Sequence, residues 1–367
     1  MLTSLIYIFS FVFVLSLVVV IHEGGHFAVA RMCGVHVTDF SVGFGKELWH
    51  RIDKKGTRWK VCAIPLGGYV KMLGDEDAAS AKSSTKNVSE NMVKYTFMAQ
   101  PLWKRAAIIF AGPGMNYLSA VLLLAGIIYT MGEVVVPAVI GYVKPESPAE
   151  TAGIEVGDKL LSINGESIEM FSDIQRIVRV VEFGKPLTII LERKGEQKEV
   201  SLMPRVMDDS NTEFPIIGVR PTPELVVIND NVNIFQAFKL AVQDVYRMTT
   251  DTLTYLGQVL FSHRSAKDMR GPLGIAEASG DAMQGGILSL LMFIVQISIA
   301  VGFMNLLPVP VLDGGHLAFY AVEAVRGKPL SEKTQNGFLV AGMSLLLLLL
   351  AYTMFLDVPR IAQRIFG

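Results

Sequence analysis

The stretch FVFVLSLVVVIHEGGHFAVARM, residues 11–32, decides the fold class of this chain. Residues 1–21 contain no charged side chain, and as a helix they would extend about 31 Å, the thickness of one hydrocarbon core. The apolar run is too long for a signal peptide and no basic region precedes it. We therefore expect a retained transmembrane helix that carries His22, Glu23 and His26 at membrane depth.

The composition of the whole chain agrees with a membrane protein. Hydrophobic residues make up 51% of the 367 residues and the mean hydropathy is +0.43, which is more apolar than soluble proteins of this size. A net charge of -1 and the lack of a basic tract give no indication of nucleic-acid binding. Two cysteines, Cys33 and Cys62, cannot form a disulfide framework and are expected to be small buried residues.

Four apolar segments are long enough to span a bilayer: residues 3–30, 106–131, 287–308 and 337–356. The sequence GPGMN, residues 112–116, places small residues near the start of the second segment, where helices can approach closely. We expect an α-helical polytopic membrane protein with about four transmembrane helices.

The distribution of charge predicts the orientation of these helices. Residues 31–105 contain thirteen Lys or Arg and seven Asp or Glu, whereas residues 134–230 contain ten basic and sixteen acidic residues. Because Lys and Arg concentrate in cytoplasmic loops, we expect residues 31–105 inside and residues 134–230 outside.

The inner loop contains TRWKVCAIPLGGYVKML, residues 57–73. Its residues alternate like a strand, break at Gly67-Gly68 and resume, which is the pattern of a β-hairpin. A hairpin next to a membrane needs its backbone groups paired or buried in protein.

Residues 135–205 show the signals of a compact α+β domain. Ser147 and Glu150 flank a helix start with Pro148 at the first position, and Ser172 with Gln175 predicts a second capping box. Asn-Gly at 164–165 and the glycine at 195 predict tight hairpin turns.

This order of elements resembles a PDZ domain of the circularly permuted bacterial type, most specifically in SPAETAGIEVGDKLLSINGESI, residues 147–168. A PDZ groove receives an extended peptide as an added strand. Ile174, Ile177, Val178 and Val181 would form the apolar wall of this groove, or serve only as core residues.

Residues 206–232 are polar and rich in proline and are expected to be a linker. Residues 233–262 have helical apolar spacing with few charges. This pattern favours an amphipathic helix at the membrane surface, with a helix packed on the PDZ domain as the alternative.

The histidines of the opening stretch suggest metal chemistry. His22 and His26 are four residues apart, so a helix places both on one face, where two imidazoles can hold Zn²⁺ and Glu23 can act as general base. Ionisable residues inside a membrane helix are functional candidates.

A catalytic zinc ion requires a third protein ligand and an open position. Asp39 and Glu47 follow the histidines closely in the sequence. The other candidate region is NLLPVPVLDGGH, residues 305–316, where prolines and glycines interrupt the third apolar segment and both Asp313 and His316 are possible ligands.

Taken together, HExxH in the first helix, GPGMN in the second, the PDZ insertion and NLLPVPVLDGG resemble the site-2 protease family over nearly the whole chain. The bacterial group that cleaves anti-sigma factors is the most similar. The resemblance implies that His22, His26 and Asp313 bind zinc and that Glu23 is the catalytic base. It further implies that Asn305 and Asn116 assist substrate binding, and that PLGGYVKM, with Gly67 and Gly68, presents the substrate in extended form.

The resemblance also implies an intramembrane zinc metalloprotease of the bacterial inner membrane. Its substrate would be a single-pass membrane protein, an anti-sigma factor first cleaved by another protease, with the active site near the cytoplasmic side and the PDZ domain in the periplasm. A peptide C-terminus would bind at Ile174 and Val178 in the PDZ groove, and membrane lipid would surround the helices. The expected domains are residues 1–132, 133–207, 208–265 and 266–367, namely the first membrane core, the PDZ domain, the linker with its amphipathic helix, and the second membrane core.

Two other classes of function are compatible with parts of the sequence. One is a non-proteolytic membrane PDZ scaffold with a structural zinc site, although structural zinc usually has four protein ligands and needs no spare glutamate. The other is a transporter whose broken helix at 305–315 binds an ion, but no corresponding broken segment occurs in the other half of the chain.

Overall fold

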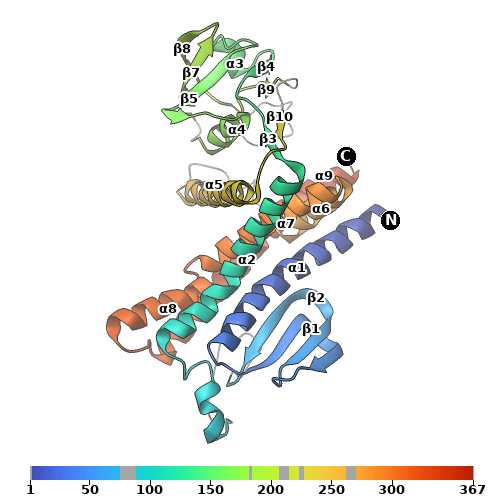
Figure 1. Ribbon diagram of the computed structural model, residues 1–367, viewed down its shortest axis with the longest axis vertical. Helices are drawn as coiled ribbons and strands as arrows, with labels where there is room; N and C mark the ends of the chain where they lie inside the picture. Colours follow the sequence, from blue (N-terminus) through green and yellow to red (C-terminus); the bar gives the residue numbers. More distant parts are fainter. Residues whose placement is uncertain are drawn as a thin grey trace. The chain divides into compact units, whose positions relative to one another are not determined.

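A computed structural model of the chain describes residues 2–74, 88–181, 184–205, 215–222, 227–261 and 270–366. The chain divides into two compact units, Met1–Leu124 with Met269–Gly367, and Ala125–Asp268. Figure 1 shows the elements of each unit, which are described separately below.

The first unit is mainly helical. Among the described residues, four helices are long and apolar enough to cross a membrane, in the segments Leu5–Met32, Leu102–Met131, Ile287–Leu306 and Lys333–Pro359. These segments belong to α1 (Leu2–Met32), α2 (Leu102–Met131), α7 (Ile287–Leu306) and α9 (Glu332–Phe366). The expected four spans are therefore confirmed by length and composition. The shorter helices of this unit are η1 (Glu90–Tyr95), α6 (Pro272–Gln284) and α8 (Asp313–Arg326).

Glycines allow the helices of this unit to pack with their backbones in close contact. A Cβ atom on Gly25 of α1 would lie 2.1 Å from the carbonyl oxygen of Ala111 in α2. A Cβ atom on Gly280 of α6 would lie 1.5 Å from the ring of Tyr7 in α1. No side chain fits at either position, so these glycines fix how closely α1 approaches its neighbours.

The inner loop forms the expected β-hairpin, but its turn is elsewhere. Strands β1 (Val37–Ile52) and β2 (Arg58–Met72) are joined by residues 53–57, where the Asp53 carboxylate accepts hydrogen bonds from the backbone N–H groups of Lys55 and Thr57. The turn expected at Gly67-Gly68 is wrong. Gly67, with φ of 125°, is an irregular position within β2.

The pairing of β1 with β2 curls the hairpin. Phe40 lies opposite both Val70 and Trp59, and Ser41 lies opposite both Tyr69 and Lys60. The first half of β1 is consequently an inner segment with a partner on each side. It packs on α1, as Figure 1 shows, in a cluster with α2 that contains Ala30, Val35, Val37, Phe40, Val70, Met72, Phe97 and Ile108.

A tight turn joins α7 to α8. Leu312 N–H donates to Val309 C=O at 3.1 Å, with Pro310 and Val311 at the two central positions. Val311 has a φ of 91°, which the second central residue of a type II turn requires and which glycine normally supplies. Positive φ is strained for a β-branched residue. The turn ends one residue before Asp313.

The second unit contains a four-stranded sheet in the order β6-β5-β7-β8. Its elements are β3 (Glu133–Val135), β4 (Ile140–Val143), α3 (Pro148–Thr151), β5 (Lys159–Ile163), β6 (Glu166–Ser167), α4 (Phe171–Val180), β7 (Leu187–Arg193), β8 (Glu196–Leu202), β9 (Val219–Pro221), β10 (Val227–Asn229) and α5 (Ile234–Leu260). The core lies between the sheet and α4, where Leu160, Ile163, Ile174, Leu187, Ile189 and Leu191 are at most 1% exposed.

Most local signals in this unit are confirmed. The Ser147 side chain accepts from Glu150 N–H at the start of α3, and positive φ at Asn164 and Gly165 forms the expected turn between β5 and β6. The cap expected at Ser172 is wrong, because α4 already begins at Phe171. The Asp173 carboxylate accepts from Met170 N–H at 3.0 Å instead.

Part of the expected linker is ordered structure. Strand β9 pairs with β4, and β10 pairs with β3.

Helix α5 buries Ala237, Ala241 and Val245. It exposes a stripe formed by Phe235, Phe238, Val242, Tyr246 and Leu253, so it is amphipathic, as expected. Its contact with the membrane surface stays a prediction.

Candidate metal centre

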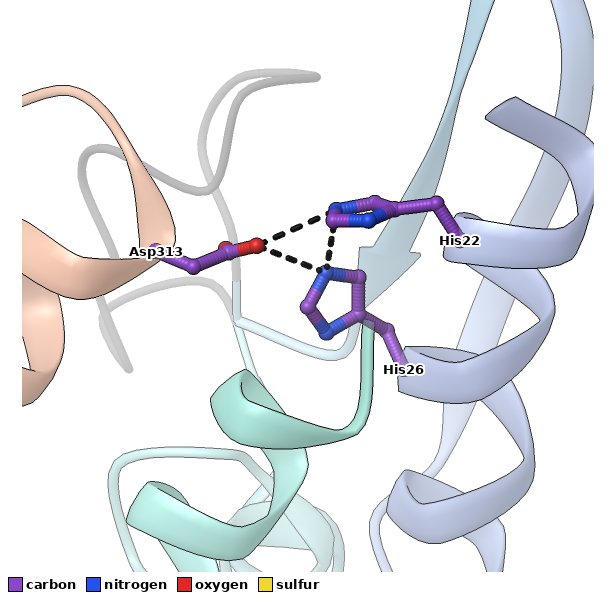
Figure 2. Close-up of side chains that lie close together, drawn as sticks. All are labelled: His22, His26 and Asp313. Atoms are coloured by element: carbon purple, nitrogen blue, oxygen red, sulfur yellow. Dashed lines mark hydrogen bonds and ion pairs between the residues drawn. The ribbon is translucent and has the colours of Figure 1, made fainter. Parts of the chain in front are cut away.

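Helix α1 and the first turn of α8 bring three potential metal ligands together. The Nε2 atoms of His22 and His26 lie 3.2 Å apart, and they lie 3.1 Å and 3.4 Å from Asp313 Oδ2 (Figure 2). Both histidines are at most 8% exposed. Among the described residues, these three form the group of His, Cys, Asp and Glu that could hold a metal ion.

The spacing of these atoms fits a tetrahedral zinc ion. With zinc–ligand distances of about 2.0–2.1 Å, ligand atoms at tetrahedral angles lie about 3.3–3.4 Å apart. Asp313 Oδ2 is buried and has no hydrogen-bond partner in the described part of the chain. A buried carboxylate oxygen is costly unless a ligand or donor compensates it. The three residues therefore fit zinc, and as a three-ligand set they leave one coordination position open.

The backbone of α2 orients His26. Its Nδ1 atom lies 2.8 Å from the carbonyl oxygen of Ile108. A carbonyl oxygen only accepts hydrogen bonds, so Nδ1 carries the proton and Nε2 of the neutral ring has a free lone pair facing Asp313. This contact selects the ring tautomer that binds a metal through Nε2.

The side chain of Asn116 in α2 orients His22, as the carbonyl of Ile108 orients His26. Its side-chain amide lies 3.2 Å from His22 Nδ1, and its Oδ1 is buried without a hydrogen-bond partner among the described residues. Because amide oxygen and nitrogen are assigned from their hydrogen bonds, we place Oδ1 toward His22, where it accepts the Nδ1 proton. Ser298 of α7 donates to the backbone carbonyl of Asn116 at 3.0 Å and ties this position to a third helix.

Gly112 makes room for both imidazoles. A Cβ atom at this position would lie 2.3 Å from His26 Nε2 and 2.8 Å from His22 Nε2. The sequence marked the glycines of GPGMN as a place for close helix packing. The more specific role of Gly112 depends on which residue of α2 faces the histidines.

Glu23 lies beside the group without belonging to it. Its Cγ is 3.5 Å from where a Cβ on Gly68 of β2 would lie, and its carboxyl interacts electrostatically with His22, His26 and Asp313. A carboxylate next to a metal site, but outside the ligand set, has the placement of a general base.

The other candidate ligands do not belong to this group of described residues. Asp39 pairs with Lys60 at 2.8 Å and Glu47 with Arg58 at 2.7 Å, both within the hairpin. The ring of His316 packs against Phe319, at 6.3 Å between ring centroids. Asn305 donates to the Val301 carbonyl within its own helix at 3.1 Å.

The second unit contains a groove of about 300 Å³ between α4 and residues 215–220. Ile174 and Val178 line the groove and are also core residues, at 1% and 4% exposed. Ile177 belongs to the core and Val181 packs against it, and neither lines the groove. Lys144, Arg179 and Arg220 supply positive charge along its walls.

Two buried imidazoles, a carboxylate and an adjacent glutamate on an apolar helix define a class, the metal-dependent hydrolases with a site inside a membrane protein. The sequence profile of peptidase family M50 matches residues 10–349. Metalloprotease MmpA of Caulobacter vibrioides is 34% identical over 98% of this chain and 97% of its own length. A protein of Agrobacterium fabrum, provisionally named a zinc metalloprotease, is 38% identical over 97% and 96%. The solved PDZ domain of an SdrC-like protein from Listeria monocytogenes is 18% identical, with a TM-score of 0.21 over 26% of this chain and 94% of that domain.

The chain therefore belongs to peptidase family M50, the site-2 proteases. It is a multi-pass membrane protein and a zinc metalloprotease.

Proposed function

We propose that this metalloprotease hydrolyses a peptide bond within a transmembrane segment of a membrane-anchored substrate. In this proposal His22, His26 and Asp313 hold zinc and Glu23 is the general base. The observation that carries the proposal is the approach of the two Nε2 atoms and Asp313 Oδ2 to within 3.4 Å of one another. The two histidines lie on α1, a helix long and apolar enough to span a membrane.

In the proposed reaction, each residue of the site has a separate role. When bound, zinc supplies a Lewis acid that polarises the scissile carbonyl and lowers the pKa of water to about 7. Glu23 accepts a proton from the attacking water and transfers it to the leaving amine. Ile108 and Asn116 keep both imidazoles in the orientation that binds the metal. A set of three ligands with a spare glutamate disfavours the alternative of a structural zinc site in a scaffold.

The hairpin supplies a place for an extended substrate. Residues 68–72 of β2 pair with β1 on one side, and Gly68 lies next to Glu23. A peptide added as a further strand along this segment would have its backbone unwound and close to the proposed base. A Cβ atom on Gly67 would meet the ring of Phe44 at 2.6 Å, and one on Gly68 would meet Ser41 O at 2.6 Å, so both positions require glycine. Asn305 and Asn116 complete the proposed substrate-binding set, with Asn116 acting through His22.

We further propose that the protein resides in a bacterial inner membrane and cleaves an anti-sigma factor that another protease has already shortened. The excess of basic residues in 31–105 supports a cytoplasmic hairpin and a periplasmic second unit. A reporter active only in the cytoplasm should work near Ser83 and fail near Asp209, two positions outside the described residues. The reverse pattern would contradict this orientation.

We propose that the second unit is a PDZ domain that controls access of substrate. In one version its bulk excludes substrates that have not been trimmed. In the other its groove binds a newly exposed C-terminus, for which the basic residues along the walls are suitable partners.

A cleavage assay tests the proposed function directly. The purified protein in lipid nanodiscs should contain close to one zinc ion per chain and should cleave a membrane-anchored test substrate within its transmembrane segment. Chelation should stop cleavage and added zinc should restore it. Cleavage outside the transmembrane segment, or cleavage that persists without metal, would contradict the proposal.

A further inference from the structure

Helix α8 carries Asp313 at its first position, but its own side chains bury little. Gly314 and Gly315 are its buried residues. Both lie against the backbone of the preceding turn, since a Cβ on Gly314 would be 2.2 Å from Leu307 O and one on Gly315 would be 2.5 Å from Val309 O. The rest of the helix is partly or fully exposed. Beyond the first turn, Phe319 packs on Phe338 of α9 and Tyr320 packs on the buried cluster of α1 and α2, but no apolar side chain of the last turn is buried.

A buried ion pair holds the other end of α8. Arg105 of α2 forms a bidentate contact with Glu323, with Nη2 to Oε1 at 2.6 Å and Nη1 to Oε2 at 3.3 Å. The two side chains are 10% and 17% exposed. Arg105 Nε donates to Gln100 O at 3.2 Å, and its guanidinium carbon lies 5.1 Å from the ring centroid of Tyr320 in α8. Arg105 is thus held in one orientation by α8 and by its own loop.

The same face of α2 carries the supports of the metal site. Arg105, Ile108, Gly112 and Asn116 are spaced by three or four residues, so they form one stripe along the helix. Ile108 and Asn116 orient the two histidines, and Gly112 makes room for them. One face of α2 therefore contacts both the helix that carries the histidines and the helix that carries the aspartate.

We propose that Arg105 and Glu323 are positioning residues that set the orientation of α8 on α2 and thereby bring Asp313 to the histidines. This inference rests on the ligand set of the proposed function. Glu323 is ten residues from Asp313, about 15 Å along the helix axis. With its first turn packed at one end and the ion pair at the other, α8 cannot rotate or swing about the tight turn that precedes it.

The geometry of the pair explains why it suits this task. The planar guanidinium matches both carboxylate oxygens and defines a direction as well as a distance. A lysine would supply the charge at a single point and would leave α8 free to turn. Arg105→Lys should therefore impair positioning although it conserves charge, and Glu323→Gln should do so although it conserves shape.

The test is the affinity for zinc of the full-length protein in nanodiscs, measured by competition with a fluorescent chelator. Each of Glu323→Gln and Arg105→Lys should weaken zinc binding about 10- to 100-fold, the effect typical of residues that orient metal ligands. The double variant R105K/E323Q should bind no more weakly than the worse single variant, since both break one interaction. Additive losses, or affinities within twofold of the parent, would overturn the proposal.

Asp158→Asn provides a matched control. Asp158 and Arg193 form another bidentate buried pair, with both contacts at 2.7 Å, in the second unit. Breaking it should lower thermal stability and leave zinc affinity unchanged. If it weakens zinc binding as much as Glu323→Gln does, the effect is general destabilisation and the positioning role is wrong.

Asp313→Ala separates this inference from the proposed function. If Asp313→Ala keeps the zinc affinity of the parent, the ligand set itself is wrong. If Asp313→Ala loses zinc and Glu323→Gln does not, the ligand set stands and the positioning role alone fails.

Discussion

Gly112 of α2 lies so close to His26 of α1 that a Cβ atom on this glycine would meet the imidazole Nε2 at 2.3 Å. The backbone of α2 is therefore one wall of the metal centre. Gly112→Ala should displace the imidazoles and weaken zinc binding about 10- to 100-fold, the range for residues that orient ligands. Zinc content after dialysis against a weak chelator measures the effect.

The control for this substitution lies on the same helix. A Cβ on Gly126 would meet no atom within 4 Å, so Gly126→Ala should leave zinc content and cleavage unchanged. Equal losses in both variants would show that α2 tolerates no alanine, and the special closeness of Gly112 to the histidines would not be the cause.

Glu23→Gln separates catalysis from metal binding. Because Glu23 lies beside the ligand group and not within it, the variant should retain zinc and lose cleavage, by at least about the 10²- to 10⁴-fold contributed by general acid–base catalysis. Metal analysis and a cleavage assay on the same sample check this. Loss of zinc together with activity would make Glu23 a ligand.

Asp313 and His316 are three residues apart, and among the described residues Asp313 belongs to the ligand group whereas His316 does not. Asp313→Ala should sharply reduce zinc content because its Oδ2 faces both imidazoles, whereas His316→Ala should not. Zinc titration of the two variants decides between them. The opposite result would move the third ligand by one helical turn.

The sequence predicted the metal centre unevenly. The spacing of His22 and His26 is a local property of one helix, so it could be predicted directly. The choice of Asp313 over His316 depends on how α8 packs, and residue spacing alone left both open. The contact of His26 with the carbonyl of Ile108 involves a backbone atom that any residue carries, so no residue type in the sequence could indicate it.

Local signals predicted the fold best where a single residue type determines the conformation. Ser147 and the Asn164-Gly165 turn act on their own neighbours and were predicted correctly. Gly67-Gly68 gave the same signal as a turn, but the carboxylate of Asp53 closes the actual turn by accepting two backbone hydrogen bonds. Which of two possible turns forms depends on strand pairing along the whole hairpin. A short stretch of sequence around either turn does not contain that information.

The groove of the second unit can be blocked without disturbing its core. Gln175 is exposed and lines the groove, so Gln175→Trp should fill it. If the groove recruits substrate, this variant should cleave trimmed substrate at least about tenfold more slowly, the loss expected for 1.4 kcal/mol of binding. If the domain only excludes bulky substrates, the rate should be unchanged.

Ser172→Trp is the matched control for the groove. Ser172 is exposed on the same helix and is not a lining residue, so its replacement should not affect cleavage in either case. Val178→Asp is a less suitable test because Val178 is only 4% exposed, and a charge there would unfold the domain.

The Asp158–Arg193 pair predicts how stability of the second unit depends on pH. Burial is the largest single influence and raises the pKa of Asp158. The hydrogen bonds from the Arg193 guanidinium and Glu155 N–H, together with the positive charges of Arg193 and Lys198, outweigh it, so the pKa lies below its ordinary value. Such a carboxylate stabilises the fold above the ordinary pKa of about 4, and this contribution is lost as the pH falls through the lower folded-state pKa.

Asp158→Asn should therefore reduce the free energy of unfolding of this unit by about 1.5–3 kcal/mol at neutral pH, the value of a hydrogen bond to a charged group. It should also flatten the pH dependence below about pH 4. Hydrogen exchange of the β5 and β7 amides in the full-length protein measures both effects. An unchanged pH dependence in the variant would assign the acid sensitivity to another group.

The turn before Asp313 has a consequence for how quickly the protein exchanges its metal. Val311 holds a backbone conformation that glycine would adopt without strain, at a cost on the order of 1–3 kcal/mol. A branched residue in this position also has far fewer alternative conformations than glycine. A conformationally restricted turn therefore holds Asp313 in its ligand position before a metal ion binds. A site preorganised in this way loses little conformational entropy on loading, so the ion should leave slowly, and the enzyme should keep one metal through many rounds of substrate entry and product release.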